Sequence, residues 1–421
     1  MAERAAPAVG PLVEEGAAPP VPESPPAPRF VLSLFIFAHF AHHVGTGGLA
    51  PLLPLVRDAF ALDYARSGLL LSAQGLALGF GQLPISALAD RVSKRVMIAV
   101  GLIGVGLAGV AISLSTSFVQ LIPLLVLTGL MAATYHAPAA SFLAETYSAL
   151  RRGRALGTHV IGGSLAFAVT PAVAIAVVQL TGSWRSAFLA LSAAPLAAGT
   201  LMLVLSWRAR GQAVPRPATS DGADQVSALA ALRAIGPLVG IALAEQLLTA
   251  SMFAFIPLFM VDQHNVPETR AGLFIALITG IGIVAAPIGG ALSDRFGRAP
   301  VLVAVTASVG PLILLLAYVP YGWPIFLVLA IYGLSMNARL PVLESLFADA
   351  VPAARRSTVL GLYYFIGQES SGVATPVVGR LIDATSPVAA FTVLGVLGCV
   401  LSLGLLFFRG QLIAHRPQRP A

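Results

Sequence analysis

Long apolar stretches recur along the whole chain and constrain its fold more than any other feature. A helix needs about 20 residues to cross the roughly 30 Å hydrocarbon core of a bilayer. The 421-residue sequence is 57% hydrophobic and 10% charged, whereas about a quarter of the residues in a soluble protein are charged. We therefore expect an all-α integral membrane protein with twelve transmembrane helices, at residues 30–56, 67–89, 96–115, 119–143, 155–180, 185–207, 233–260, 271–292, 299–319, 323–347, 357–382 and 387–408.

The chain also contains an internal repeat. The turn Ala87-Leu88-Ala89-Asp90-Arg91 returns as Ala291-Leu292-Ser293-Asp294-Arg295, at an offset of 204 residues (294 − 90). The register continues without a gap through further pairs, which are Asp58/Asp262, Arg66/Arg270, Gly68/Gly272, Gly129/Gly333 and Glu145/Asp349. Self-similarity at a fixed offset indicates repeated structural units. We expect two parallel six-helix repeats, 30–207 and 233–408, around a central cavity, with a cytoplasmic linker at 208–232.

The basic residues predict the orientation in the membrane. The formal net charge is +7, and most arginines and lysines lie in connections on one side of the predicted spans. Because basic residues in short loops stay cytoplasmic, both termini are predicted inside the cell, in a multi-pass protein of the bacterial inner membrane. This charge distribution indicates orientation and not nucleic-acid binding. The single Cys399 excludes an intrachain disulfide.

The two ends of the chain lie outside the predicted spans. Residues 1–29 are rich in Ala, Pro and Glu and lack the apolar segment of a signal peptide. They cannot bury a core, so we expect a disordered cytoplasmic tail. Residues 409–421 are expected to form a second cytoplasmic tail.

The first predicted helix carries the densest polar cluster, His39, His42 and His43. Residues three and four apart lie on one helical face, so this face should look into protein or water. Imidazole titrates near physiological pH, which suits proton carrying. Hydrogen bonding across a helix interface is an alternative interpretation. A metal site from His39 and His43 at i, i+4 is another, and the lack of a nearby carboxylate or cysteine in the sequence disfavours it.

The second half carries polar groups that are predicted to lie within the membrane. They come from helices seven, ten and eleven and are Glu245, Gln246, Asn337, Arg339, Tyr363, Gln368 and Glu369. A charged side chain at the bilayer centre costs about 2.5–3.5 kcal/mol on insertion scales, so these groups should face a cavity or one another. We expect Arg339 to pair with Glu369 or Glu245.

The repeated charged turn resembles the loop signature of the major facilitator superfamily, a Gly, then Asp-Arg, then Gly and a basic pair between helices two and three. Residues 290–298 match it well, whereas the first copy has Ser86 and Ser93 at the glycine positions. An aspartate at a helix end beside arginines can pair with another helix in one conformation and release it in another. A solvated loop that only fixes topology is the alternative. The expected gating residues are Asp90, Arg91, Arg95, Glu145, Asp294, Arg295, Arg298 and Asp349.

Helices four and five carry a second resemblance. Tyr135-His136-Ala137-Pro138 is followed by Gly162-Gly163 and then by Pro171. This arrangement is similar to the fosmidomycin-resistance branch of the superfamily, in which an aromatic-His-Pro stretch precedes a Gly-Gly pair and a proline. Ala137 is an insertion relative to that pattern. The Gly-Pro and Gly-Gly signature of other drug-efflux families is absent from helix five.

These features predict a transporter and not an enzyme. No Gly-x-x-x-x-Gly-Lys motif points to ATP, and no cofactor is expected. Two six-helix repeats with polar groups between them describe alternating access, of which the superfamily is itself a standard example. We expect proton-coupled export of a drug-like or toxic compound by a monomer. The alternatives are uptake or exchange of a small carboxylate, and a membrane sensor that does not transport.

Besides gating, we expect polar residues to act in substrate binding and in proton coupling. The expected substrate-binding residues are His39, His43, Tyr135, His136, Gln246, Asn337, Arg339, Tyr363 and Gln368. The expected proton-coupling residues are His42, Glu245 and Glu369.

Overall fold

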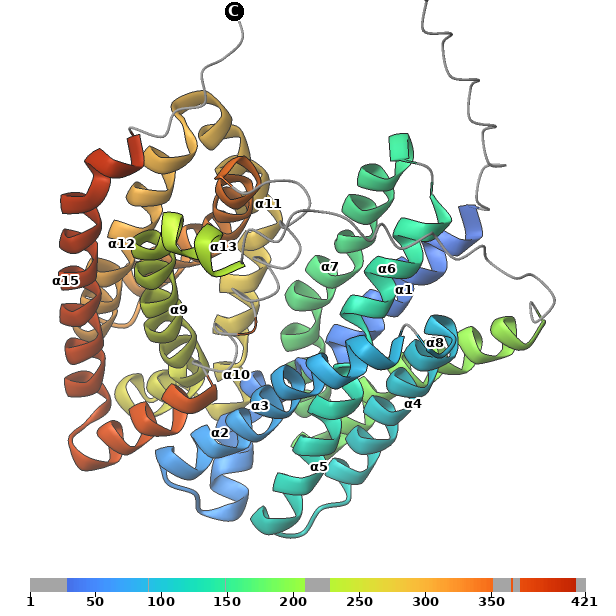
Figure 1. Cartoon of the computed structure of the whole chain (residues 1–421). Helices are drawn as coiled ribbons and strands as arrows, with labels where there is room; N and C mark the ends of the chain where they lie inside the picture. Colours follow the sequence, from blue (N-terminus) through green and yellow to red (C-terminus); the bar gives the residue numbers. More distant parts are fainter. Residues whose placement is uncertain are drawn as a thin grey trace, which may run out of the picture.

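The computed structural model describes residues 29–89, 91–147, 149–208, 228–350, 365 and 372–413, which form helices joined by short connections (Figure 1). The helices of the first half are α1 (Arg29–Thr46), α2 (Leu49–Phe60), α3 (Tyr64–Ala89), α4 (Lys94–Ser113), α5 (Phe118–Ala132), α6 (His136–Thr146), α7 (Ala149–Thr181) and α8 (Trp184–Arg208). Those of the second half are α9 (Ala228–His264), α10 (Glu268–Ala271), α11 (Leu273–Phe296), α12 (Arg298–Tyr318), α13 (Trp323–Ala350), a helix over 372–384, and α15 (Pro387–Ile413).

Ten helical stretches among the described residues are long and apolar enough to cross a membrane. Two predicted spans are not among the ten. The span predicted at 67–89 is the 26-residue helix α3, and the span predicted at 357–382 is described only at residue 365 and from 372 onward. In the described part of the chain, α1 with α2, α5 with α6, and α10 with α11 each correspond to one predicted span. The helices therefore follow the predicted order, and the all-α membrane fold is confirmed.

The first predicted helix is split in two, which the sequence analysis did not anticipate. Helix α1 ends at Thr46 and α2 begins at Leu49, with Gly47 and Gly48 between them. A Cβ atom on Gly48 would lie 2.8 Å from Cδ1 of Leu191 in α8. The glycine therefore lets the break pack directly against a neighbouring helix.

The fourth predicted helix is also split. Helix α5 ends at Ala132 and α6 begins at His136. The N–H of Tyr135 donates to the carbonyl of Ala132 at 3.1 Å, a tighter turn than an α-helix makes. Pro138 is the third residue of α6, where a backbone N–H has no intrahelical partner and a proline is tolerated. The break places Tyr135 and His136 at the junction of two helices.

The two halves pack through equivalent helices. In the first half α4 packs against α8 and α3 against α5, and in the second half α12 packs against α15 and α11 against α13. Gly129 and Gly333, which the repeat aligns, lie at equivalent crossings. A Cβ on Gly333 would lie 2.9 Å from the carbonyl oxygen of Ile278, and one on Gly129 would collide with the carbonyl oxygen of Gln74. Small residues at these positions allow the backbones to approach closely.

Contacts between the halves also occur in equivalent pairs. Helix α7 packs against α11, and α3 approaches the helix over 372–384. A Cβ on Gly68 in α3 would lie 3.0 Å from the carbonyl oxygen of Thr375, and one on Gly272 would lie 2.8 Å from Cγ1 of Ile175 in α7. The start of α1 and the end of α15 lie at one end of the molecule, and the α2–α3 connection lies at the other (Figure 1). We refer to the latter as the outer end, a name that follows the orientation predicted from the sequence.

Candidate functional site

Five of the seven histidines of the chain gather between α1, α6 and α7. The histidine cluster consists of His39, His42, His43, His136 and His159. Ring centroids lie 4.4 Å apart for His39 and His159, 4.7 Å for His42 and His136, and 5.3 Å for His43 and His136. The broken fourth helix makes this possible, because His136 is the first residue of α6 and its ring meets the face of α1.

Hydrogen bonds fix the orientation of two of these rings. Nδ1 of His39 lies 3.1 Å from the carbonyl oxygen of His159, and Nε2 of His39 lies 3.2 Å from Nε2 of His43. A carbonyl oxygen only accepts, so His39 donates from Nδ1. A neutral His39 then has its Nε2 lone pair directed at Nε2 of His43. The ligand nitrogens of His39, His43 and His136 all lie within 4.8 Å of one another, so these three side chains could hold a metal ion.

Aromatic packing and a glycine surround the cluster. The ring of Tyr135 stacks on His42 with centroids 4.8 Å apart, and its hydroxyl donates to the carbonyl of Phe35 at 3.0 Å. A Cβ on Gly163 would lie 2.8 Å from Nε2 of His39. The Gly-Gly pair that the sequence singles out therefore leaves room for the imidazoles.

The sequence analysis did not include His159 among the site residues. Its side chain is buried, as are those of His39 and His42, whereas His43 and His136 are partly exposed. The signal in the sequence was a histidine within a predicted transmembrane helix.

In the second half, Arg339 of α13 pairs with Glu245 of α9, one of its two expected partners. Nη1 of the arginine lies 3.6 Å from Oε2 of Glu245, and Nη2 donates to Oε1 of Gln246. Arg339 is 6% exposed and Glu245 is 3% exposed. Breaking one side of such a buried pair leaves an uncompensated charge, so removal of either partner is costly.

The side chain of Asn337, an expected substrate-binding residue, makes hydrogen bonds that hold two helices together. Its amide nitrogen donates to the carbonyl of Ile278 at 3.1 Å and to that of Gly333 at 2.7 Å. The side chain therefore ties α13 to α11. Tyr363, Gln368 and Glu369 lie outside the described residues.

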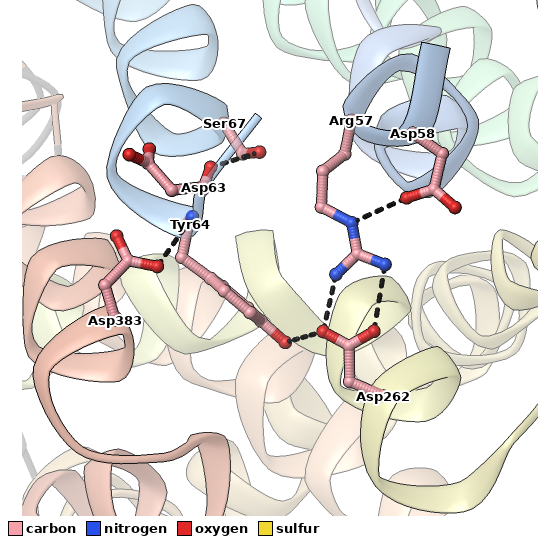
Figure 2. Close-up of polar contacts among 7 residues, drawn as sticks. All are labelled: Arg57, Asp58, Asp63, Tyr64, Ser67, Asp262 and Asp383. Atoms are coloured by element: carbon pink, nitrogen blue, oxygen red, sulfur yellow. Dashed lines mark hydrogen bonds and ion pairs between the residues drawn. The ribbon is translucent and has the colours of Figure 1, made fainter. Parts of the chain in front are cut away.

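A network at the outer end joins the two halves, and the sequence analysis missed it (Figure 2). The guanidinium of Arg57 donates two hydrogen bonds to the carboxylate of Asp262, at 2.5 and 2.9 Å. The hydroxyl of Tyr64 donates to the same carboxylate at 2.6 Å. The signal in the sequence was Arg57 itself, a basic residue on the side where acidic residues prevail.

A second contact of this network uses the start of α3. The backbone N–H groups of Tyr64 and Ala65 donate to the carboxylate of Asp383, each at 2.9 Å, and a carboxylate is favoured at a helix N-terminus. The equivalent contact of the repeat is also present. Gln179 lies 204 residues before Asp383, and its side chain donates to the carbonyl of Thr269 at 3.3 Å. Matching contacts on both sides of the repeat therefore join the two halves at the outer end.

The charges predicted to act in gating lie near the opposite end. Lys94 Nζ pairs with the carboxylate of Glu145, which links α4 to α6, and Arg298 pairs with Asp294 within one turn. The guanidinium of Arg95 lies 5.5 Å from the ring centroid of Phe142, that of Arg295 lies over the ring of Phe296, and Arg91 is exposed. Asp90 and the side chain of Asp349 lie outside what the structure describes. Glu145, one of the expected gating residues, is thus paired with Lys94.

The described polar residues form separate sites. The histidine cluster belongs wholly to the first half, and the pair of Glu245 and Arg339 belongs wholly to the second. Among the described residues, no hydrogen bond or ion pair joins the two sites.

The architecture defines the class of protein. Helices that span the membrane in two groups of equivalent packing, each with buried polar side chains, describe a multi-pass membrane transporter built from parallel repeats. The sequence model of the Major Facilitator Superfamily matches residues 35–376 and, in a second match, residues 238–420. The chain belongs to the major facilitator superfamily, a family of transporters and not of enzymes.

Known proteins of the family are similar over most of the chain. The uncharacterised MFS-type transporter YfnC of Bacillus subtilis is 22% identical over 83% of this chain and 87% of the relative. The fosmidomycin resistance protein of Escherichia coli is 21% identical over 85% of this chain and 87% of the relative. A solved bacterial homologue of the human lysosomal transporter Spinster, in an inward-facing and occupied conformation, superposes with a TM-score of 0.75 at 16% identity, over 93% of this chain and 97% of that chain. The likeness to this structure concerns the fold.

Proposed function

We propose that this secondary transporter of small molecules is a proton-coupled exporter of a drug-like or toxic organic compound. The buried pair of Glu245 and Arg339 carries this proposal. The glutamate is the titratable partner, and its protonation removes the charge that holds Arg339. The arginine and Gln246 can then bind an anionic or polar part of a substrate in place of the carboxylate.

The carboxylate of Glu245 and the substrate thereby compete for Arg339. When the substrate leaves, Arg339 regains Glu245 and the proton is released. A ligand shifts a conformational equilibrium only through its different affinity for the two states. Competition between a carboxylate and a substrate for one guanidinium supplies such a difference.

Export is supported by the similarity to the fosmidomycin resistance protein and by the Tyr135-His136 and Gly162-Gly163 segments. We assign substrate contacts to Tyr135, His136 and the partly exposed His43, together with Arg339. Proton transfer through His42, and through Glu369 outside the described residues, belongs to the same proposal.

The outer network supports alternating access. Arg57, Tyr64 and Asp262 close one end of the molecule in the described state, and they must separate for substrate to leave there. We propose that the other end faces the cytoplasm, with both termini there, in a bacterial inner membrane. The halves 30–207 and 233–408 would then move as two bodies.

Uptake or exchange of a small carboxylate is the second candidate. The arginine and the five imidazoles favour it, because all of these groups can bind anions. A sensor that binds a ligand without moving it is the candidate from another class.

The test is a flux measurement on the purified protein in proteoliposomes. A panel of antibacterial compounds and small carboxylates is added while the pH inside and outside is recorded. Proton movement driven by a drug-like compound, in the direction opposite to it, supports the proposal. Proton movement with a carboxylate supports the second candidate, and binding without any flux identifies a sensor.

A further inference from the structure

Three histidines of the cluster approach one another with the geometry of metal ligands. His39 and His43 are one helical turn apart on α1, with ring centroids 4.9 Å apart. His136 comes from the start of α6, and its centroid lies 5.5 Å from that of His39. Helices α1 and α6 thus supply the three imidazoles of one candidate site.

The distances between the nitrogen atoms fit a small metal ion. Zn–N bonds of about 2.0–2.1 Å in a tetrahedron place two ligand nitrogens about 3.3–3.4 Å apart. The Nε2 atoms of His39 and His43 are 3.2 Å apart. All three ligand nitrogens lie within 4.8 Å of one another, so a shift of His136 on the order of 1–1.5 Å completes the set.

The surroundings of His39 match those of a metal-binding imidazole. A metal-ligating histidine generally donates its second ring N–H to a carbonyl or carboxylate, which fixes the tautomer and the ring orientation. Nδ1 of His39 makes this contact with the carbonyl of His159 at 3.1 Å. The Nε2 lone pair is therefore presented to the point where His43 and His136 converge.

The site borders partly exposed residues, and a glycine leaves room for its imidazoles. His43 and His136 are partly exposed, whereas His39 is buried, so an ion would enter from the side of His43 and His136. A Cβ on Gly163 would lie 2.8 Å from Nε2 of His39 and 3.1 Å from Cδ2 of His43. Only glycine leaves this space open.

We propose that His39, His43 and His136 bind one divalent transition-metal ion such as Zn²⁺. Imidazole ligands select zinc, copper or nickel over magnesium and calcium, which prefer oxygen. Three protein ligands leave one coordination position for water or an anion. This site lies apart from the pair of Glu245 and Arg339, but it shares His43 and His136 with the proposed substrate contacts. Metal binding measured without any transported compound therefore tests it separately from the proposed export.

The test titrates the full-length protein with Co²⁺ and Zn²⁺. The protein is purified without a polyhistidine tag, treated with a chelator and reconstituted in nanodiscs. We expect one Co²⁺ per chain, with the visible absorption of four-coordinate cobalt, and displacement of that signal by Zn²⁺. Absence of stoichiometric binding to the unmodified protein overturns the proposal.

Substitutions assign the ligands. His39→Gln, His43→Gln and His136→Gln should each weaken binding at least tenfold. His264→Gln changes a histidine outside the cluster, so it should bind as the unmodified protein does. If the three ligand variants retain full affinity, or if His264→Gln loses as much, the assignment is wrong.

A measurement on the unmodified protein guards against variants that fail to fold. Diethyl pyrocarbonate modifies accessible imidazole nitrogens, and mass spectrometry locates the products. Zn²⁺ should protect His43 and His136 several-fold while His264 reacts at its usual rate. Equal modification of all these residues with and without Zn²⁺ contradicts the site.

Discussion

Replacement of Asp262 by asparagine should open the outer end of the protein. The substitution removes the negative charge that accepts two hydrogen bonds from Arg57 and one from Tyr64. The side chain of Arg57 is 13% exposed and that of Asp262 is 29% exposed, so the pair is partly shielded from water. Hydrogen bonds to charged groups contribute about 1.5–3 kcal/mol, whereas fully exposed ion pairs contribute about 0.2–1 kcal/mol.

A loss of about 2 kcal/mol follows for this partly buried network. Each 1.4 kcal/mol changes an equilibrium constant tenfold, so the ratio of outer-closed to outer-open molecules should fall about 30-fold. An open state populated at about 1% would rise to about a fifth of the molecules.

The assay measures the separation of the two halves at the outer end. Spin labels are placed at Thr116→Cys and Pro320→Cys, two exposed positions in the α4–α5 and α12–α13 connections, in a Cys399→Ser background. Double electron–electron resonance should show a second, longer distance in Asp262→Asn. Asp63→Asn is the matched control, because the Asp63 side chain accepts a hydrogen bond from Arg66 N within its own half.

The control should keep the distance distribution of the background protein. An Asp262→Asn distribution that coincides with that of Asp63→Asn would refute the idea that this network closes the outer end. A double-mutant cycle with Arg57→Gln supplies the coupling energy directly, and a coupling near zero leads to the same conclusion.

Two further predictions concern stability. Arg339→Met leaves Glu245 buried without its cation, so the free energy of unfolding in detergent should fall by about 3–5 kcal/mol. Adding Glu245→Gln should recover part of this loss. A double variant that is no more stable than Arg339→Met contradicts the pairing. Gly310→Ala forces a Cβ onto the backbone of Cys399 where α12 meets α15, and should cost about 1–3 kcal/mol. Gly280→Ala, where a Cβ meets no atom of the described residues within 4 Å, is its control, and equal thermal midpoints for the two variants would show that the close contact does not matter.

The membrane fold could be predicted from the sequence because lipid imposes a length and a composition on each span. The repeat offset placed Gly129 with Gly333, and both prove to lie at equivalent helix crossings. The breaks at Gly47-Gly48 and before His136 were not predicted. An apolar stretch has the same length and composition whether its helix is continuous or split.

The site was predicted only in part, for a similar reason. Spacing along α1 places His39, His42 and His43 on related faces, but it does not say which helix packs against them. His159 joins the cluster only through tertiary packing of α7 on α1, and Asp262 meets Arg57 across 205 residues of chain. Contacts between helices depend on the fold, so they could not be predicted from a single sequence.

The role of Glu245 is the central claim, and one measurement tests it most directly. Once a transported compound is known, proteoliposomes with Glu245→Gln are compared with unmodified protein in two modes, uphill transport driven by a pH gradient and exchange of labelled for unlabelled compound without a gradient. Asp63→Asn, an acid-to-amide replacement away from Arg339 at a residue that accepts a hydrogen bond within its own half, is the control. We expect Glu245→Gln to lose uphill transport and to retain exchange. Uphill transport at the unmodified rate in Glu245→Gln would contradict the account and make Glu245 a structural partner of Arg339.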